Sequence, residues 1–505
     1  MRKHALNQMD IPKDPLDLRL EVNEQKLKAM FAFCEDIRLT TRRYGPDLRY
    51  DALSIECESL IHQEKRDLLS SLLKDLALEV TARDQSGSAA QITFEQVEHY
   101  FDKQGISASE YQLLERLDQV ADSVLSGQTV LLFDGWNRAL SIGDVSVERR
   151  QVAEPALESV VMGPREATVE NLKTNLGLLR FRLKSPRFKL RKITAGSEKK
   201  SDIVYAYLDG IVNPEMLAEF QKRLSKISDV DILDPSYIEE LIEDSTYSPF
   251  PQYRYTERPD VAISALLAGK ILVLMEGSPM ILICPGLFIE FFQSSEDYYQ
   301  RTLYSTFIRI MRMLAFTIAL TLSSIYIAFS TYHPELIPSV LLLTIAKSRE
   351  GIPFPAFVEA IVMEISFELL REAGIRLPQP IGSAISIVGA LIIGEAAINA
   401  GIASPIMIVV VSLTGIASFA LPQYNMAIAI RLLRFPLMAL AAFLGGFGLM
   451  IGILAILLHL TKLRSLGQPY LSYVAPLRPK QLKDVFIRFP LKRLLRSSRG
   501  KSSLP

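Results

Sequence analysis

The sequence predicts an α/β soluble region, built from two related α/β units, followed by an all-α transmembrane domain. Three observations lead to this fold class. Charged residues recur every few positions up to Arg312, long apolar runs follow, and two stretches of the first 300 residues resemble each other. The chain has 505 residues, 56 basic and 56 acidic side chains, and a mean hydropathy of +0.20. These averages conceal two regions of different character.

Four apolar segments predict membrane-spanning helices, because about 20 apolar residues in a helix cross the hydrocarbon core of a bilayer. The expected spans are 313–332, 377–397, 402–422 and 435–458. The alternative is a soluble protein with a large buried helical core. Four such runs within about 150 residues disfavour it.

The distribution of charge predicts that both ends of the chain are cytoplasmic. No apolar signal segment precedes the polar N-terminal region. The tail 478–505 has nine basic residues and one acidic residue, a net charge of +8. Four spans put both ends inside, although Arg431 and Arg434 would then lie in an outer loop. Five spans would put that pair inside and the tail outside, and this alternative stays open.

Two segments between the spans are apolar or amphipathic without being typical spans. Residues 336–346 suit a re-entrant or interfacial segment. Residues 354–373 have a helical pattern with Glu359, Glu364 and Glu368, the last two on one face. The pattern indicates an amphipathic helix that lies on the membrane or lines a wet cavity. A solvated surface face is the alternative.

The soluble region contains an internal repeat. Residues 51–61 resemble 202–212, and residues 121–135 resemble 263–277. Each copy predicts strand, helix, helix and strand, with buried strands that end in an acidic residue and glycine. The expected domains are an N-terminal extension (1–19), two α/β units (20–150 and 151–295), a transmembrane domain (296–477) and a basic cytoplasmic tail (478–505).

Nothing in the sequence indicates an enzyme, a cofactor or a metal centre. It has no P-loop, no G-x-S-x-G and no H-E-x-x-H motif. Three cysteines and five scattered histidines give neither a disulfide framework nor a metal-binding spacing. Asp134 and Glu276 end predicted strands, but the glycine after each favours a turn role over catalysis. A formal net charge of +0 gives no reason to expect nucleic acid.

Two pairs of charged residues are candidates for subunit or domain contacts. Arg165 and Glu166 lie where Pro164 could begin a helix, in a stretch rich in arginines that could form forks on carboxylates. Arg258 and Asp260 lie in a proline-rich connector, where the prolines are expected to exclude helix. The alternatives are an ordinary solvated helix face and a plain loop.

Charged and aromatic residues flank the first expected span. Arg309 and Arg312 follow the segment Glu296–Arg301, whose Tyr298 and Tyr299 suit a membrane interface. This segment is a candidate for coupling between the soluble and membrane parts.

The segment 381–397 is the best pore candidate, because its small residues allow close helix packing and its hydroxyl groups can face water. The pore-lining candidates are Ser383, Ser386, Ile387, Val388 and Glu395. A ring of glutamates from several subunits would attract cations. The alternative is that Glu395 marks a helix end at the interface.

Several ordered strings resemble the A subunit of the GerA-type spore germination receptors, over about Gly127 to Leu477. They include Gly-Pro-Arg-Glu-Ala (163–167), Ser-Pro-Phe-Pro (248–251), Thr-Glu-Arg-Pro-Asp (256–260), Glu-Asp-Tyr-Tyr (296–299), Ser-Arg-Glu-Gly-Ile-Pro-Phe-Pro (348–355) and Arg-Glu-Ala-Gly-Ile-Arg-Leu-Pro (371–378). The chain departs from the family pattern at Met162, Glu395, Leu466 and Gln468.

The resemblance implies a nutrient receptor subunit of the inner spore membrane. It implies a transporter-like B subunit and a lipoprotein C subunit as partners, contact with membrane lipids, and self-association into an ion-conducting assembly. A non-conducting scaffold subunit is the alternative.

Overall fold

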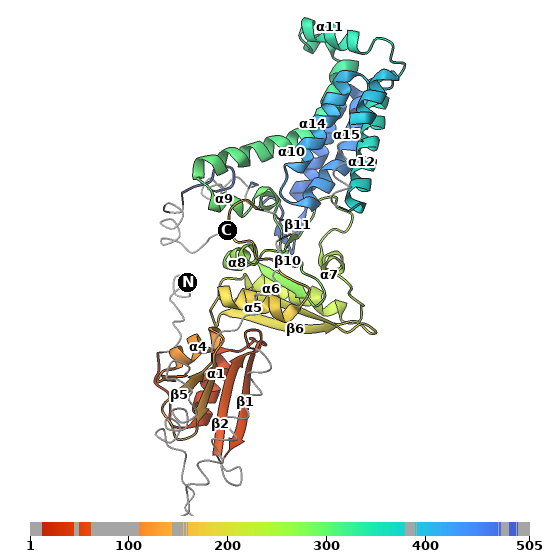
Figure 1. Ribbon diagram of the computed structural model, residues 1–505. Helices are drawn as coiled ribbons and strands as arrows, with labels where there is room; N and C mark the ends of the chain where they lie inside the picture. The colour runs from red at the N-terminus through yellow and green to blue at the C-terminus, as the bar shows by residue number, and fades with distance from the viewer. Residues whose placement is uncertain are drawn as a thin grey trace, which may run out of the picture. The chain divides into compact units, whose positions relative to one another are not determined.

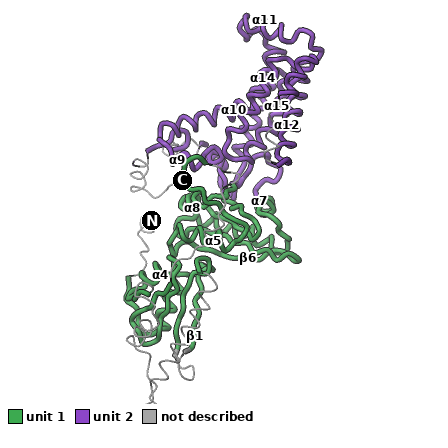
Figure 2. Tube along the Cα trace, viewed as in Figure 1, with its two compact units in different colours: residues 1–242, 255–284, 498–505 green, residues 243–254, 285–497 purple. Residues whose placement is uncertain are grey.

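The computed structural model describes residues 13–44, 50–61, 111–143, 155, 158, 160–378, 389, 391–472, 474–475, 484–490 and 492. The chain forms two compact units (Figure 2). The first comprises 1–242, 255–284 and 498–505, and the second comprises 243–254 and 285–497. Figure 1 shows sheets and helices in the first unit and mainly helices in the second. The predicted succession of an α/β region and a helical region with apolar helices is confirmed.

The first sheet has five antiparallel strands in the order β1-β2-β4-β5-β3. Its elements are β1 (Ile37–Tyr44), β2 (Tyr50–Cys57), β3 (Tyr111–Leu114), β4 (Thr129–Phe133) and β5 (Ala139–Ile142). Helices α1 (Leu20–Met30) and α4 (Leu117–Leu125) contribute leucine and valine side chains to the same core as the strands.

The second sheet has the equivalent order β6-β7-β9-β10-β8. Its strands are β6 (Phe188–Ala195), β7 (Ser201–Leu208), β8 (Arg254–Thr256), β9 (Ile271–Met275) and β10 (Ile281–Cys284). Its helices are α5 (Leu172–Arg182), α6 (Pro214–Leu224), α7 (Pro235–Ile242) and α8 (Pro259–Leu267). Numbered from its own first strand, each sheet has the order 1-2-4-5-3. The predicted pair of related units is therefore confirmed by topology, and the helical residues expected after residue 61 in the first copy lie outside the described residues.

The acidic residues that end β4 and β9 have the same role in both copies. Asp134 accepts a hydrogen bond from the backbone N–H of Leu20, at 3.0 Å, and Glu276 accepts one from that of Leu172, at 2.9 Å. Both N–H groups begin a helix, where backbone donors have no partner within the helix. The glycine after each acid has positive φ, 84° at Gly135 and 87° at Gly277. The expected turn role is thus correct, and each carboxylate also caps a helix from a distant strand.

A buried ion pair joins the two α/β parts within the first unit. Arg180 at the end of α5 donates from Nε and Nη2 to the two carboxylate oxygens of Asp36, both at 2.7 Å. The arginine side chain is 0% exposed, and its guanidinium lies over the ring of Phe188. This is the arginine fork on a carboxylate that the sequence suggested for this stretch.

The second unit is built from helices. They are α9 (Glu296–Tyr299), α10 (Thr302–Thr331), α11 (Ser339–Ser348), α12 (Ala356–Arg376), α14 (Pro405–Phe419) and α15 (Tyr424–Lys462). Short 3-10 turns precede α9 (Phe288–Phe292) and α11 (Pro334–Leu336), and a short hairpin of β11 (Arg464–Ser465) and β12 (Gln468–Pro469) follows α15. Two helices, α10 and α15, are long and apolar enough to cross a membrane, and α11 and α14 are shorter apolar helices.

The chain reverses direction inside α15, which differs from the single span expected over 435–458. Gly445 has φ 60° and ψ −141°, so it interrupts the helix. A Cβ atom at Gly452 would lie 2.4 Å from a methyl carbon of Leu437, a closeness that one straight helix cannot give across 15 residues. The two arms, 424–444 and 446–462, therefore pack on each other. Tyr332 stabilises the break by donating its hydroxyl to the backbone carbonyls of Ala442 and Phe443.

The cap at α5 gives a first prediction. Replacing Glu276 with Ala leaves the N–H of Leu172, the first residue of α5, without this acceptor, while Asn171 still accepts from the N–H of Thr174. We expect a loss of about 1 kcal/mol in the free energy of unfolding and faster hydrogen exchange at the start of α5. The measurement is hydrogen exchange on the full chain, with Glu198→Ala as an exposed control. Unchanged protection of Leu172 would contradict the capping role.

Candidate functional site

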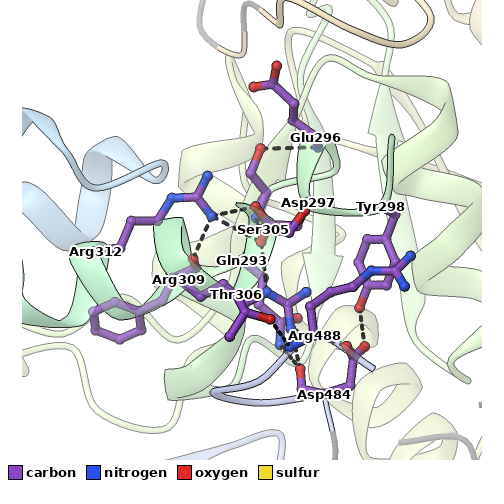
Figure 3. Close-up of polar contacts among 12 residues, drawn as sticks. Gln293, Glu296, Asp297, Tyr298, Ser305, Thr306, Arg309, Arg312, Asp484 and Arg488 are labelled. Carbon is purple, nitrogen blue, oxygen red and sulfur yellow. Dashed lines mark hydrogen bonds and ion pairs between the residues drawn. The ribbon is translucent and has the colours of Figure 1, made fainter. Parts of the chain in front are cut away.

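The strongest charged cluster of the second unit lies at the start of α10 (Figure 3). Arg309 donates from Nε to Asp297 at 2.9 Å, and Arg312 donates from Nη1 to both oxygens of the same carboxylate, at 2.8 and 3.0 Å. Asp297 belongs to the short helix α9 and is 2% exposed. Two cations thus converge on one buried anion, and α9 is fixed against the first three turns of α10.

The C-terminal segment 484–490 packs on the same cluster. The backbone carbonyl of Asp484 accepts a hydrogen bond from Arg309 Nη1 at 2.5 Å, and the Asp484 carboxylate accepts another at 3.2 Å. The backbone N–H of Arg488 donates to Thr306 Oγ1 at 3.2 Å. Asp484 has φ 74°, an uncommon left-handed conformation that several contacts hold in place. The start of the first apolar helix and the C-terminal segment therefore form one structure.

Tyr298 lies at the centre of this cluster. Its hydroxyl donates to Asp484 Oδ2, and the guanidinium groups of Arg309 and Arg488 lie 5.4 and 5.1 Å from its ring centroid. Partial burial, which leaves 38% of the residue exposed, followed by the negative charge of Asp484, raises the pKa of Tyr298 to about 12. The phenol stays protonated and remains a donor to the carboxylate at every physiological pH.

The predicted residues Arg309 and Arg312 are thus brought together by Asp297. Asp484 and Arg488 complete the site and were not predicted, because they lie more than 170 residues away in a tail whose basic composition drew attention only to membrane orientation. Nothing in the local sequence around Asp484 distinguishes it from a solvated acid.

The three glutamates of α12 are paired with arginines. Glu359 accepts from Arg349 Nε at 3.1 Å and from the backbone N–H of Ser404, at the start of α14, at 3.0 Å. Glu368 accepts from Arg431 at 2.8 Å.

Glu364 accepts hydrogen bonds from Arg434, Ser323 and Thr414. Glu359 and Glu364 are each 1% exposed, so the alternative of a solvated face does not describe them. Arg434, expected in an outer loop, is 2% exposed inside the first arm of α15.

The other predicted pairs have local partners. Glu166 accepts from Arg182, while Arg165 is exposed, and residues 161–169 are not helical, so the helix expected from Pro164 is wrong and α5 begins at Leu172. Arg258 and Asp260 form a fork with each other, at 2.9 and 3.1 Å. The expectation that proline excludes helix there is also wrong, because Pro259 occupies the first position of α8, where a missing N–H costs nothing.

The proline-rich loop 243–254 leaves the second sheet after α7 but belongs to the second unit. Ser248 Oγ lies 2.8 Å from His459 Nε2, in the last turn of α15, and Phe250 stacks on the histidine ring. Ser465 Oγ donates to the backbone carbonyl of Gln252, and Tyr470 donates to that of Pro251. The end of α15 and the turn after it thus hold the loop at several points.

Four of the pore-lining candidates, Ser383, Ser386, Ile387 and Val388, lie outside the described residues. Glu395 lies on the helical stretch 391–399 and is exposed. Among the described residues, no group of three or more His, Cys, Asp and Glu side chains could hold a metal ion.

Comparison with known proteins gives matches over most of the chain. The family model described as "Bacillus/Clostridium GerA spore germination protein" matches residues 25–499. The chain is 41% identical to an "Uncharacterized membrane protein YfkQ" of Bacillus subtilis (strain 168), over 94% of this chain and 90% of that protein. It is 45% identical to "Spore germination protein KA" of the same organism, over 74% and 69%. It is 40% identical to "Spore germination protein GerLA" of Bacillus cereus, over 76% and 78%.

The solved structures that match include the N-terminal domain of the A subunit of the Bacillus megaterium spore germinant receptor GerK3. It has a TM-score of 0.41 and 26% sequence identity, and the match covers 55% of this chain and 98% of that chain.

The cluster at α10 gives the second prediction. Asp297→Asn removes the anion between Arg309 and Arg312, and we expect the free energy of unfolding to fall by about 3 kcal/mol because Arg312 loses the carboxylate that it binds and Arg309 keeps only that of Asp484. The measurement is thermal unfolding of the full chain in detergent. Glu296→Gln, one position away, is the control. A melting temperature equal to that of the control would contradict the role of Asp297.

Tyr298 gives a third prediction. Because its pKa is raised in the folded protein, its contribution to stability is present below the unfolded pKa of about 10 and is lost as the pH rises from there toward 12. Tyr298→Phe, which cannot ionise, is expected to lose stability less steeply than the parent between about pH 10 and 12. Unfolding midpoints at a series of alkaline pH values test this, and parallel curves for parent and variant would overturn it.

Proposed function

We propose that the chain, which belongs to the Bacillus/Clostridium GerA spore germination protein family, is a membrane subunit of a nutrient germinant receptor that triggers spore germination. The observation that carries this proposal is the match over residues 25–499, together with relatives named as spore germination proteins. The fold supports it, because an α/β region is followed by helices of which two are long and apolar enough to cross a membrane.

The receptor is a complex in this proposal. The chain acts with a transporter-like B subunit, which holds the germinant, and a lipoprotein C subunit, in the inner spore membrane. The soluble region and the basic tail lie on the cytoplasmic side, because the net charge of +8 over 478–505 favours that face. The cluster around Asp297 supports the proposal that the soluble region and the basic tail lie on the same side of the membrane, because it packs the segment 484–490 against the start of α10.

The finer proposal is that several copies assemble into a germinant-gated cation channel. The segment 381–397 supplies the pore, with small and hydroxyl-bearing residues along successive turns. The support from the described residues is the exposure of Glu395, since a glutamate that contacts no apolar core is available to a shared pore. The paired glutamates of α12 serve packing in this scheme, because each already has an arginine partner.

A fourth prediction tests conduction. Spores carrying Glu395→Gln or, separately, Val388→Ala are expected to release cations at an altered rate after germinant addition, or to leak without germinant, because a lost ring charge or a widened constriction changes permeation. Receptor abundance is measured in the same spores. Glu372→Gln is the matched control, because Glu372 is 60% exposed at the end of α12 and lies outside the pore segment.

Unchanged release in both variants at normal abundance would exclude this pore segment and favour a scaffold that assembles the receptor without conducting. Loss of germination in a deletion strain, restored by the parent gene, tests the receptor role separately from conduction.

A further inference from the structure

A continuous seam of polar side chains runs between α12, α14 and the first arm of α15. On α12, Glu364, Glu368 and Arg371 follow one another by about one turn on a single face. Thr414 and Ser418, also one turn apart, contact this face from α14, since Thr414 donates to Glu364 and Arg371 donates to Ser418 at 2.9 Å. The seam lies in the part of the second unit that is otherwise apolar.

The seam has more positive than negative charge. Arg431 and Arg434 of α15 bring the number of arginines to three, against the two glutamates of α12. Arg434 pairs with Glu364, and Arg431 pairs with Glu368 at 2.8 Å. Arg371 has only a longer contact, at 3.6 Å, with the carboxylate that Arg431 already binds. Among the described residues of the seam, one positive charge is therefore left without a carboxylate of its own.

The seam also contains buried hydrogen-bond donors without acceptors. Nε and Nη2 of Arg434 and Nε of Arg371 have no partner among the described residues. The two side chains are 2% and 8% exposed, so bulk water does not reach them. Every unpaired atom of the two guanidinium groups is a donor. A buried donor that lacks a partner is strongly unfavourable, more so on a cation in apolar surroundings.

We propose that this seam binds one small monovalent inorganic anion, of the size and charge of chloride. A single negative charge would neutralise the seam, and an anionic acceptor makes stronger hydrogen bonds to guanidinium donors than a neutral one does. A neutral water would supply an acceptor but would leave the positive charge uncompensated. The aromatic rings of Phe367 and Phe419, which lie 5.6 and 4.2 Å from the Arg371 guanidinium, limit the size of the ligand on that side.

The bound anion would join α12 to the first arm of α15 near Arg371, about one turn beyond Glu368. This role goes beyond the proposed receptor function and is independent of which ions the assembly conducts. It assigns the anion to the packing of the bundle and not to a pore.

The test measures chloride binding to the purified full chain in detergent. Thermal unfolding is followed while gluconate is replaced by chloride at constant sodium and constant ionic strength, and binding of radioactive chloride gives the stoichiometry. We expect the melting temperature to rise by a few degrees in a saturable way, with one chloride bound per chain. An equal melting temperature in both salts with no bound chloride would overturn the proposal.

Two variants on α12 shift the binding in opposite directions. Arg371→Gln removes the excess charge and is expected to abolish the chloride dependence. Glu368→Gln adds one net positive charge and is expected to tighten chloride binding roughly threefold to tenfold. Arg376→Gln is the matched control, because Arg376 lies on the same helix, is 77% exposed and pairs with Glu372.

If Arg371 and Glu368 only hold the helices together, the chloride dependence of the variants should follow a different pattern. If Arg371→Gln and Glu368→Gln weaken the chloride effect equally, or if Arg376→Gln weakens it as much as they do, the seam does not bind an anion and the proposal fails. A parallel titration with phosphate distinguishes a small free anion from the phosphate of a lipid headgroup as the ligand. Stabilisation by phosphate that exceeds the effect of chloride would point to a lipid headgroup and would overturn a small monovalent anion.

Discussion

A charge within an apolar helical bundle is stable only when an opposite charge and hydrogen bonds surround it, and this constraint governs the second unit. Three glutamates of α12, Glu359, Glu364 and Glu368, cannot lie within the bundle without partners. Glu359 accordingly binds both the turn before α12 and the start of α14, whereas Glu364 and Glu368 bind the first arm of α15. Apolar contacts hold the helices together, and these pairs determine which faces meet. A shift of α12 by one turn would bury several charges without partners.

The same requirement for an opposite charge and hydrogen bonds explains the cluster at the start of α10, where the apolar part of the helix ends. A helix of 30 residues is about 45 Å long, whereas the hydrocarbon core of a bilayer is about 30 Å thick. The first turns, with Arg309 and Arg312, therefore extend beyond the apolar length. Asp297 and Asp484 bind these arginines from two distant parts of the sequence. Any movement of α10 along its axis would break contacts with both α9 and the C-terminal segment, so the helix and its two neighbours move together.

The strands and the duplication could be predicted, because they depend on the local sequence pattern. The chain reversal and the buried ion pairs could not, because they depend on contacts between residues far apart in the sequence. The strands at 130–133 and 271–275 follow from short apolar runs closed by an acidic residue and glycine, and the duplication follows from their recurrence. Hydropathy indicated apolar helices, but it could not show that Gly445 turns the chain back, because two adjacent glycines in an apolar run also suit helix packing. Arg431 and Arg434 suggested a loop, since a charge in an apolar segment is costly until its partner is known. That partner lies 63 or 70 residues away in the sequence.

The loop 243–254 shows how the chain joins its two units through more than one connection. The chain leaves the first unit after Ile242, returns to it at Tyr255, and leaves again after Cys284. Between the first two crossings, Ser248, Pro251 and Gln252 are bound by His459, Tyr470 and Ser465, at the end of α15 and in the turn that follows. The end of α15 and the turn after it therefore fix the short segment before β8, in which Pro249 and Pro251 restrict the backbone. β8 is an edge strand of the second sheet.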